Sequence, residues 1–423
     1  MSTQCGNSNP DLSPTDPCQP VGVCCGSSCS GEKSPLGPAG AHFQNSIAHA
    51  LAAAEQAHQD GRPIVGILCE YTPRELIMAA GALSVCLCGG SAEMIDPAER
   101  ELPANLCPLI KSTYGYHLTK TNPFLEMADL IVAETTCDGK KKMYELMAQS
   151  RPMHVLELPQ KPDQAQAFGH WLHELRELRQ GLEGYFGTSI SDEKLREAIR
   201  LMNRERTLRR KLAELMKADS PPLTGRQLLD FKSTISGLEG DFTQYETALE
   251  DLTHQAGPPE RAQQVRVLLT GVPMAHGAER VMDLIEEAGG LVVALESCTG
   301  VKPIWDNIDE TAADPLEAIA RKYFQLPCSV MTPNDGRLDL LAELAQDFRA
   351  ECVIDLTWQA CLTYDVEAAR VRKFADETLR LPYLQIVTDY SPNDSARISV
   401  RVEALLETVI AKRPTDKPNC GGQ

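Results

Sequence analysis

Short apolar runs alternate with amphipathic stretches along the first part of the chain. Strand-like runs bounded by turn residues occupy 62–71, 84–90, 127–136 and 153–159. Apolar residues at helical spacing occupy 43–59, 74–83 and 140–149. Thr72 and Pro73 are the expected start of the second helix, because proline is favoured at a first helical position. Strands that alternate with helices predict a parallel sheet covered on both faces.

Residues 164–255 contain only helical patterns. Ser191 precedes a long amphipathic helix, and the carboxylates of Asp192 and Glu193 in its first turn suit the positive end of the helix dipole. The basic cluster of this helix comprises Arg204, Arg206, Arg209, Arg210 and Lys211. We expect a solvated face here; the alternative is a docking surface for an acidic partner or a phosphate-bearing substrate.

The alternation of strands and helices resumes near Val265. Strand patterns occupy 265–271, 290–296, 352–357 and 382–390, with helical patterns between and after them. The expected fold class is α/β, with two doubly wound parallel-sheet domains facing each other and a helical middle segment. The expected boundaries are a disordered Cys-rich leader at 1–38, a first α/β domain at 39–163, a helical segment at 164–260, a second α/β domain at 261–413 and a disordered tail at 414–423.

Composition and charge exclude several classes of protein. Of 423 residues, 43% are hydrophobic, which is ample for a sizeable core. The 59 acidic residues exceed the 41 lysines and arginines, and a net charge of −18 argues against nucleic-acid or anionic-membrane surfaces. No apolar run approaches a membrane span, and no secretory signal pattern begins the sequence, so we expect a cytoplasmic protein.

Fifteen cysteines indicate metal or redox chemistry in a long chain without a secretory signal. Five of them lie in the leader, as Cys5, Cys18, Cys24, Cys25 and Cys29. We expect these to be exposed thiols of a disordered leader; the alternative is an extra metal site or a sacrificial thiol cluster. Cys352 is expected in the core, and Cys420 is expected to be inert.

Six further cysteines are the candidate ligands: Cys69, Cys107, Cys137, Cys298, Cys328 and Cys361. At least four of them lie where a strand pattern ends, which is the edge where open α/β sheets bind ligands. Thiolates suit iron–sulfur clusters or zinc, but the six lack the short CxxC spacing of zinc knuckles. We therefore predict a cluster held between the two domains. Cys86 and Cys88 share one strand face, so that one of them could also reach the site.

Three lysines follow Cys137 at a helix start, at positions 140–142. They would bind a phosphate or tune a negatively charged cluster, or else form a solvated first turn. The loop at 269–279 contains neither GxGxxG nor a P-loop pattern, which argues against a nucleotide site. The nine histidines show no metal-ligand spacing.

Several segments resemble the 2-hydroxyacyl-CoA dehydratase / benzoyl-CoA reductase superfamily over residues 45–411. They include GILCEYTPRELIMAAGA, LPANLCPLIKSTYGY, ETTCDGKKKMYE, ALESCTG and LPCSVMTPND. Within the superfamily the chain is most similar to the double-cubane cluster proteins. The resemblance implies that Cys107, Cys137 and Cys361 match the ligands of a family [4Fe-4S] cluster, and that Cys69, Cys298 and Cys328 complete an [8Fe-9S] double cubane. Cys88 remains an alternative to Cys69. Asn122 stands where some relatives have cysteine.

The resemblance also implies an activity. An ATP-hydrolysing [4Fe-4S] activator would pass low-potential electrons to this chain, an oxidoreductase that reduces small unsaturated molecules under anaerobic conditions as a homodimer. The alternative is a 2-hydroxyacyl-CoA dehydratase subunit, a lyase with a single [4Fe-4S] cluster that acts by ketyl-radical chemistry. A further alternative is an electron-transfer or cluster-carrier protein without its own substrate. Neither catalytic residues, the substrate nor the particular ATPase follows from the sequence.

Overall fold

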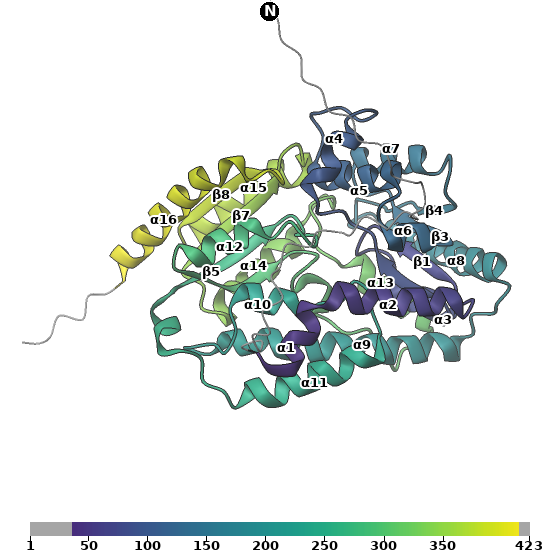
Figure 1. The fold of residues 1–423 in the computed structure, drawn as a ribbon, viewed down its shortest axis with the longest axis horizontal. Helices are drawn as coiled ribbons and strands as arrows, with labels where there is room; N and C mark the ends of the chain where they lie inside the picture. The colour runs from purple at the N-terminus through teal and green to yellow at the C-terminus, as the bar shows by residue number, and fades with distance from the viewer. Residues whose placement is uncertain (1–35, 414–423) are drawn as a thin grey trace, which may run out of the picture.

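A computed structural model describes residues 36–413, and two parallel sheets organise them (Figure 1). The first sheet contains β1 (Ile64–Ile67), β2 (Leu83–Cys86), β3 (Leu130–Glu134) and β4 (Met153–Leu156), in the order β2-β1-β3-β4. The second contains β5 (Val265–Gly271), β6 (Gly290–Glu296), β7 (Cys352–Trp358) and β8 (Tyr383–Thr388), in the order β6-β5-β7-β8. Every pairing between these strands is parallel. The predicted α/β fold with two parallel sheets is confirmed.

Helices surround both sheets. The first half contains α1 (Gly37–Gln44), α2 (Ser46–Gln59), α3 (Arg74–Ala79), α4 (Ile95–Ala98), α5 (Pro108–Thr119), α6 (Pro123–Met127) and α7 (Asp138–Met147). The middle contains α8 (Ala167–Phe186), α9 (Asp192–Glu214), α10 (Gly225–Asp230) and α11 (Glu239–Thr253). The second half contains α12 (Arg280–Glu287), α13 (Pro315–Phe324), α14 (Asp335–Asp347), α15 (Leu362–Phe374) and α16 (Ser395–Lys412).

Short helical turns join these elements. They are the 3-10 turns η1 (Ala92–Met94), η2 (Leu215–Lys217), η3 (Pro259–Gln263), η4 (Lys302–Ile304) and η6 (Pro392–Asp394), and the π turn η5 (Ala375–Leu379). None of the helices in the described range is long and apolar enough to cross a bilayer.

Alternate residues of each buried strand pack on opposite faces of its sheet, as a doubly wound sheet requires. In β1, Ile64 packs with Ala50 and Ala54 of α2, whereas Val65 packs in a different cluster with Leu76 of α3. The cluster that contains Ile64 continues into the second half, through strand β5 and helices α12 and α16. The two sheets therefore share one continuous region of core.

Three local predictions differ from the structure. The helix expected over 43–59 is interrupted at Asn45, between α1 and α2. Helix α3 begins at Arg74, with Pro73 as its N-cap rather than its first residue. Thr72 does not cap it, because its hydroxyl donates to the buried carboxylate of Glu134 at the end of β3.

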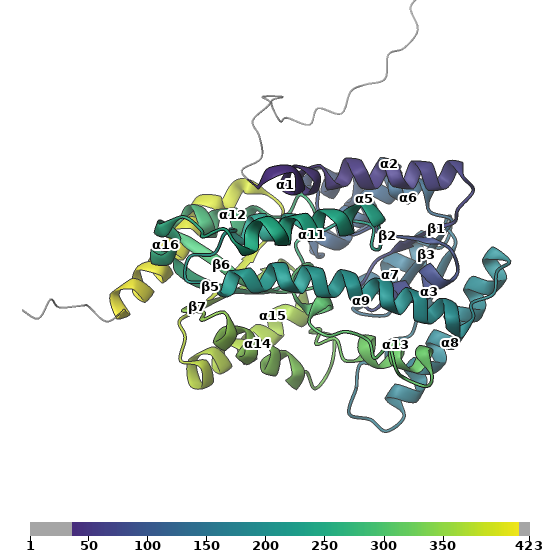
Figure 2. The same cartoon turned by 90° about the horizontal axis from the view of Figure 1, so that it is seen from below.

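The helical middle segment spans the two halves. Helix α9 runs past both sheets, as Figure 2 shows from below. Its start is as predicted, with the Ser191 hydroxyl accepting from the Lys194 N–H. The solvated face expected for its basic cluster is wrong for Arg206, which is buried and forms an ion pair with buried Glu75 of α3. Arg210 donates to the carbonyls of Ile304 and Trp305 and so joins α9 to the second half.

Candidate functional site

Four of the six candidate cysteines lie just beyond the carboxyl end of a strand, two in each sheet. Cys69 follows β1 and Cys137 follows β3, which are neighbours in the first sheet. Cys298 follows β6 and Cys361 follows β7, on either side of β5 in the second sheet. The strand order reverses between β1 and β3 in the first sheet and between β5 and β7 in the second. Cys69, Cys137 and Cys361 thus lie where open α/β sheets bind ligands, beyond the carboxyl ends of their strands, whereas Cys298 follows the edge strand β6. The predicted placement at strand ends is confirmed.

Cys107, Cys137 and Cys361, here called the first triad, each occupy the N-cap position of a helix. Cys107 precedes α5, Cys137 precedes α7 and Cys361 precedes α15. The exposed N–H groups and the dipole at a helix N-terminus stabilise negative charge. A thiolate or an anionic group at these three positions is therefore favoured by the backbone itself.

The first triad joins the two halves of the molecule. The thiols of Cys107 and Cys361 act on each other, and this interaction lowers the pKa of Cys107 and raises that of Cys361. The backbone N–H groups of Leu109 and Ile110, in the first turn of α5, also help to lower the pKa of Cys107. Burial raises the pKa of Cys137, and the nearby Cys361 raises it further. The three sulfurs thus lie in each other's electrostatic field.

Cys69, Cys298 and Cys328, here called the second triad, gather beside the first. Burial raises the pKa of Cys69 well above its usual value, and the adjacent Cys298 and Cys328 raise it further. Burial likewise raises the pKa of Cys298 to about 12. Cys328 lies in the loop between α13 and α14 and also acts on Cys137 of the first triad. The structure therefore brings all six predicted cysteines into one region.

One of the three consecutive lysines enters this region. Lys140 is half-buried, and its Nζ donates to the carbonyl of Leu68 at 2.6 Å. Burial opposes its charge, but Cys69 and Cys137, one from each triad, help to raise its pKa well above the usual value. Lys141 and Lys142 are exposed and pair with neighbouring carboxylates. Lys140 is thus placed where it could tune a negatively charged cluster, the first role predicted for these lysines. Lys141 and Lys142 fit the alternative, a solvated first turn of the helix.

Lys302 is a second cation beside the cysteines; it is buried, and it was not predicted from the sequence. Its Nζ lies 2.7 Å from Glu296 Oε1, and it acts directly on the Cys298 thiol. Although burial opposes it, ion pairs with Lys302 and Arg337 hold the pKa of Glu296 below its usual value. A lysine four residues after a strand-end cysteine is the only sequence signal that could have indicated this position.

The cysteines outside the two triads differ in their surroundings. The neighbouring Cys88 lowers the pKa of Cys86 to about 6, whereas the Cys88 thiol donates to the Leu68 carbonyl and lies near Cys69 and Lys140. Cys88 is thus placed close enough to the second triad to remain an alternative ligand. Cys352 begins β7 and is fully buried, as predicted for a core residue. The leader cysteines and Cys420 lie outside the described residues.

Two further features bear on which groups the site can hold. Across residues 36–413, no three His, Cys, Asp or Glu side chains are grouped closely enough for a single metal ion. In an iron–sulfur cluster each cysteine binds a different iron, so the ligands of a cluster are spread more widely than those of a single ion.

Asn122, which stands where some relatives have cysteine, caps α6 by accepting from the N–H groups of Phe124 and Leu125, so its side chain has a structural role.

The donor chemistry of the two triads fits iron–sulfur ligation. All six donors are soft thiols, and burial raises the pKa of several of them, including Cys69 and Cys298. A buried thiol of this kind loses its proton readily only when a metal cation binds the sulfur in place of the proton. Helix N-termini at the first triad, together with Lys140 and Lys302, supply positive potential for a group of net negative charge.

The chain is similar to proteins of known family along most of its length. A family model described as 2-hydroxyglutaryl-CoA dehydratase, D-component, matches residues 69–409. The putative dehydratase subunit YjiM of Escherichia coli (strain K12) is 40% identical over 359 residues, covering 82% of this chain and 91% of that protein. The (R)-phenyllactyl-CoA dehydratase beta subunit of Clostridium sporogenes is 21% identical, covering 83% and 93%. A benzoyl-CoA reductase subunit of Thauera aromatica is 23% identical, covering 81% and 89%.

Proposed function

The chain belongs to the 2-hydroxyglutaryl-CoA dehydratase D-component family, within the 2-hydroxyacyl-CoA dehydratase / benzoyl-CoA reductase superfamily, and from this premise we propose that its six clustered cysteines hold a double-cubane [8Fe-9S] cluster. We further propose that the protein takes low-potential electrons from an ATP-hydrolysing [4Fe-4S] activator and reduces small unsaturated molecules. It would do so in the cytoplasm as a homodimer.

One observation carries this proposal: the second triad lies beside the first. A single [4Fe-4S] cluster needs only the cysteines of the first triad and leaves Cys69, Cys298 and Cys328 without a role. These three lie after β1, after β6 and in the loop before α14, yet they act on one another electrostatically. Three soft donors converging from distant segments favour a second group of irons over chance packing.

The protein side chains would provide ligands and electrostatic support. When bound, an iron–sulfur cluster supplies one-electron transfer at low potential. The protein's own part is to hold the six thiolates and to offset the charge of an added electron with Lys140 and Lys302. Burial around both lysines strengthens this effect, because the local dielectric is low.

The names of the relatives favour a second candidate function. The (R)-phenyllactyl-CoA dehydratase relative is a beta subunit, and the benzoyl-CoA reductase relative is likewise named as a subunit. By analogy, this chain would hold one [4Fe-4S] cluster on the first triad and act with a related second subunit on a 2-hydroxyacyl-CoA thioester. A carrier that only passes electrons on is the remaining alternative.

Iron and acid-labile sulfide analysis of anaerobically purified protein separates the first two candidates. We expect about eight irons per chain for the double cubane, whereas about four would support the single-cluster dehydratase subunit. Reduction of a small unsaturated probe such as acetylene, dependent on both the activator and ATP, is expected. A fully loaded protein without that activity would favour the electron carrier.

A further inference from the structure

Glu134 is a fully buried carboxyl group at the end of β3, three residues before Cys137. Its Oε1 accepts a hydrogen bond from the Thr72 hydroxyl, whereas its Oε2 has no hydrogen-bond partner. Among residues 36–413, Glu134 forms no ion pair, and no hydrogen bond joins its side chain to any of the six candidate ligands. A buried carboxylate with a single neutral donor is costly, so burial favours the protonated form.

A glutamate that ends a strand of the second sheet provides a comparison. Glu296, the last residue of β6, is also fully buried and also accepts from a threonine hydroxyl, that of Thr270. It pairs in addition with Lys302 and Arg337, at 2.7 and 3.2 Å. These two cations keep Glu296 charged, whereas Glu134 has no such pair among the described residues.

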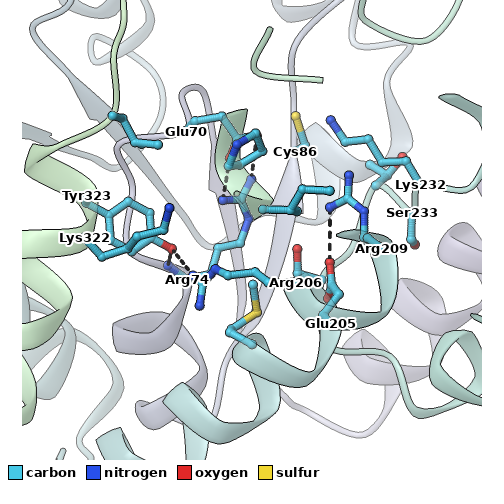
Figure 3. A pocket seen from close by; sticks show the side chains of 16 residues that line it. Glu70, Arg74, Cys86, Glu205, Arg206, Arg209, Lys232, Ser233, Lys322 and Tyr323 are labelled. Carbon is cyan, nitrogen blue, oxygen red and sulfur yellow. Dashed lines mark hydrogen bonds and ion pairs between the residues drawn. The ribbon is translucent and has the colours of Figure 1, made fainter. Parts of the chain in front are cut away.

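Two cations face Glu134, but other groups hold both of them. Lys140 of α7 donates through its Nζ to the Leu68 carbonyl at 2.6 Å. Arg74 of α3 donates to both carboxylate oxygens of Glu70, at 2.8 and 3.0 Å, in the wall of the pocket that Figure 3 shows. Lys140 and Arg74 therefore act on Glu134 only from a distance, and the negative charge of Glu70 opposes their effect.

The pKa of Glu134 follows from these surroundings. Burial raises this pKa to about 7, although the hydrogen bond from Thr72 and the charge of Lys140 lower it. The Cys69 thiol and Tyr144 of α7 also face Glu134, and a negative charge at either position would raise the pKa of Glu134 further. The carboxyl group therefore gains or loses a proton near neutral pH when the charge beside it changes.

We propose that Glu134 binds a proton when a cluster held by the adjacent cysteines takes up an electron. This inference rests on the proposed function, because it requires an electron to arrive at the site of Cys69 and Cys137. The electron adds negative charge beside Glu134, and this charge favours the neutral carboxyl group. The carboxylate of Glu134 becomes a carboxylic acid with a proton from the solvent, while the electron comes from the activator.

The added proton cancels the charge of the added electron inside the protein, where an uncompensated charge is costly. Lys140 and Lys302 act differently, because their pKa values lie above the usual value and both stay protonated. Glu134, in contrast, changes its charge with the state of the cluster. The reduction potential should therefore depend on pH, which fixed positive charges alone would not produce.

Reductive titration of the anaerobically purified full-length protein, from about pH 6 to about pH 9, tests the proposal. We expect reduction to tighten proton binding at Glu134 at least tenfold. The parental potential should then fall as pH rises, by about 59 mV in total for each tenfold. Glu134→Gln keeps an acceptor for Thr72 but cannot bind the proton, so it should lose this fall. The matched control is Glu157→Gln, an exposed glutamate just after β4 of the same sheet, which should keep the parental profile.

Infrared difference spectra between the reduced and oxidised protein give a second readout. We expect a carboxylic-acid C=O band to appear on reduction in the parent and in Glu157→Gln, and to be absent from Glu134→Gln. A further variant, Thr72→Val, removes the hydroxyl that stabilises the carboxylate, so the fall in potential should move to higher pH. This variant keeps the test decisive if Glu134→Gln does not fold.

Two results would overturn the proposal: a parental potential that does not change with pH, and a fall with pH that Glu134→Gln retains in full. Iron analysis of the same samples separates this inference from the proposed function. About four irons per chain would contradict the double cubane but leave the proton uptake intact, because Glu134 lies near Cys69 of one triad and Cys137 of the other. A chain without iron would overturn both proposals.

Discussion

The thiols of Cys107 and Cys361 lie close enough to shift each other's pKa in opposite directions, although each stands at the start of a helix from a different half of the molecule. Cys107 precedes α5 of the first half, and Cys361 precedes α15, directly after the central strand β7 of the second. The contact marks the place where the carboxyl ends of the two sheets meet. A cofactor bound there would be held by both halves at once, and its loss would remove contacts between them.

Replacing Lys140 by methionine should lower the reduction potential of the bound cluster. The substitution removes a half-buried positive charge that lies near both triads and replaces it with an apolar side chain. Addition of an electron then becomes less favourable, because less positive potential offsets it. A reductive titration followed by electron paramagnetic resonance measures the shift. Lys142→Met, exposed on the same helix, is the control and should leave the potential unchanged; an equal shift in both variants would contradict the assignment.

Replacing Arg206 by methionine should destabilise the protein by about 3–5 kcal/mol, because Glu75 would keep a buried charge without its partner. Urea unfolding measures the effect. The double variant Arg206→Met, Glu75→Gln should recover part of the loss, since it removes the orphaned charge. Lys211→Met, on the exposed side of the same helix, should change stability by less than about 0.5 kcal/mol. A similarly small effect at Arg206 would mean that the pair is not buried.

Replacing Lys322 by methionine should stabilise the protein at pH 7. The pKa of Lys322 is about 8 in the folded protein against 10.5 as its ordinary value, so the unfolded chain binds its proton more tightly. Between pH 8 and 10.5 the unfolding free energy of the parent therefore rises with pH. The variant should be more stable below pH 8, by at most about 3 kcal/mol, and the advantage should vanish above pH 10.5. Urea unfolding at pH 7 and at pH 10.5 measures this; equal differences at both pH values would contradict it.

The sequence predicted the positions of the cysteines well because they depend on local patterns. Buried strands read as apolar runs, and the carboxyl ends of parallel strands lie at one edge of a sheet, so Cys69, Cys137, Cys298 and Cys361 could be placed before the structure was known. The role of these residues as cluster ligands remains a prediction that rests on the family resemblance.

The surroundings of charged side chains were not predictable in this way. The sequence pattern placed Arg206 on a solvated basic face, because its partner Glu75 lies on a distant helix and nothing in the sequence links the two. Lys302 and Lys322 have no local signal for burial either, since lysine is rarely buried and only the packing of two halves encloses them. The structure was needed to find the burial and the ion-pair partners of charged residues, because the spacing of hydrophobic residues in the sequence does not reveal them.

The most direct test of the double-cubane proposal is the iron content of Cys298→Ser and Cys328→Ser, purified without oxygen and compared with the parent by iron analysis and electron paramagnetic resonance. Serine is nearly isosteric with cysteine but removes the soft donor that iron prefers. We predict that each variant stays folded and loses iron and the parental spectrum. Cys69→Ser should do the same, and Cys107→Ser, Cys137→Ser and Cys361→Ser should be the most affected. Cys352→Ala, a buried cysteine of β7, should keep the parental iron. If Cys298→Ser and Cys328→Ser both kept the full parental iron and spectrum, the double-cubane proposal would be wrong and the single-cluster dehydratase subunit would take its place.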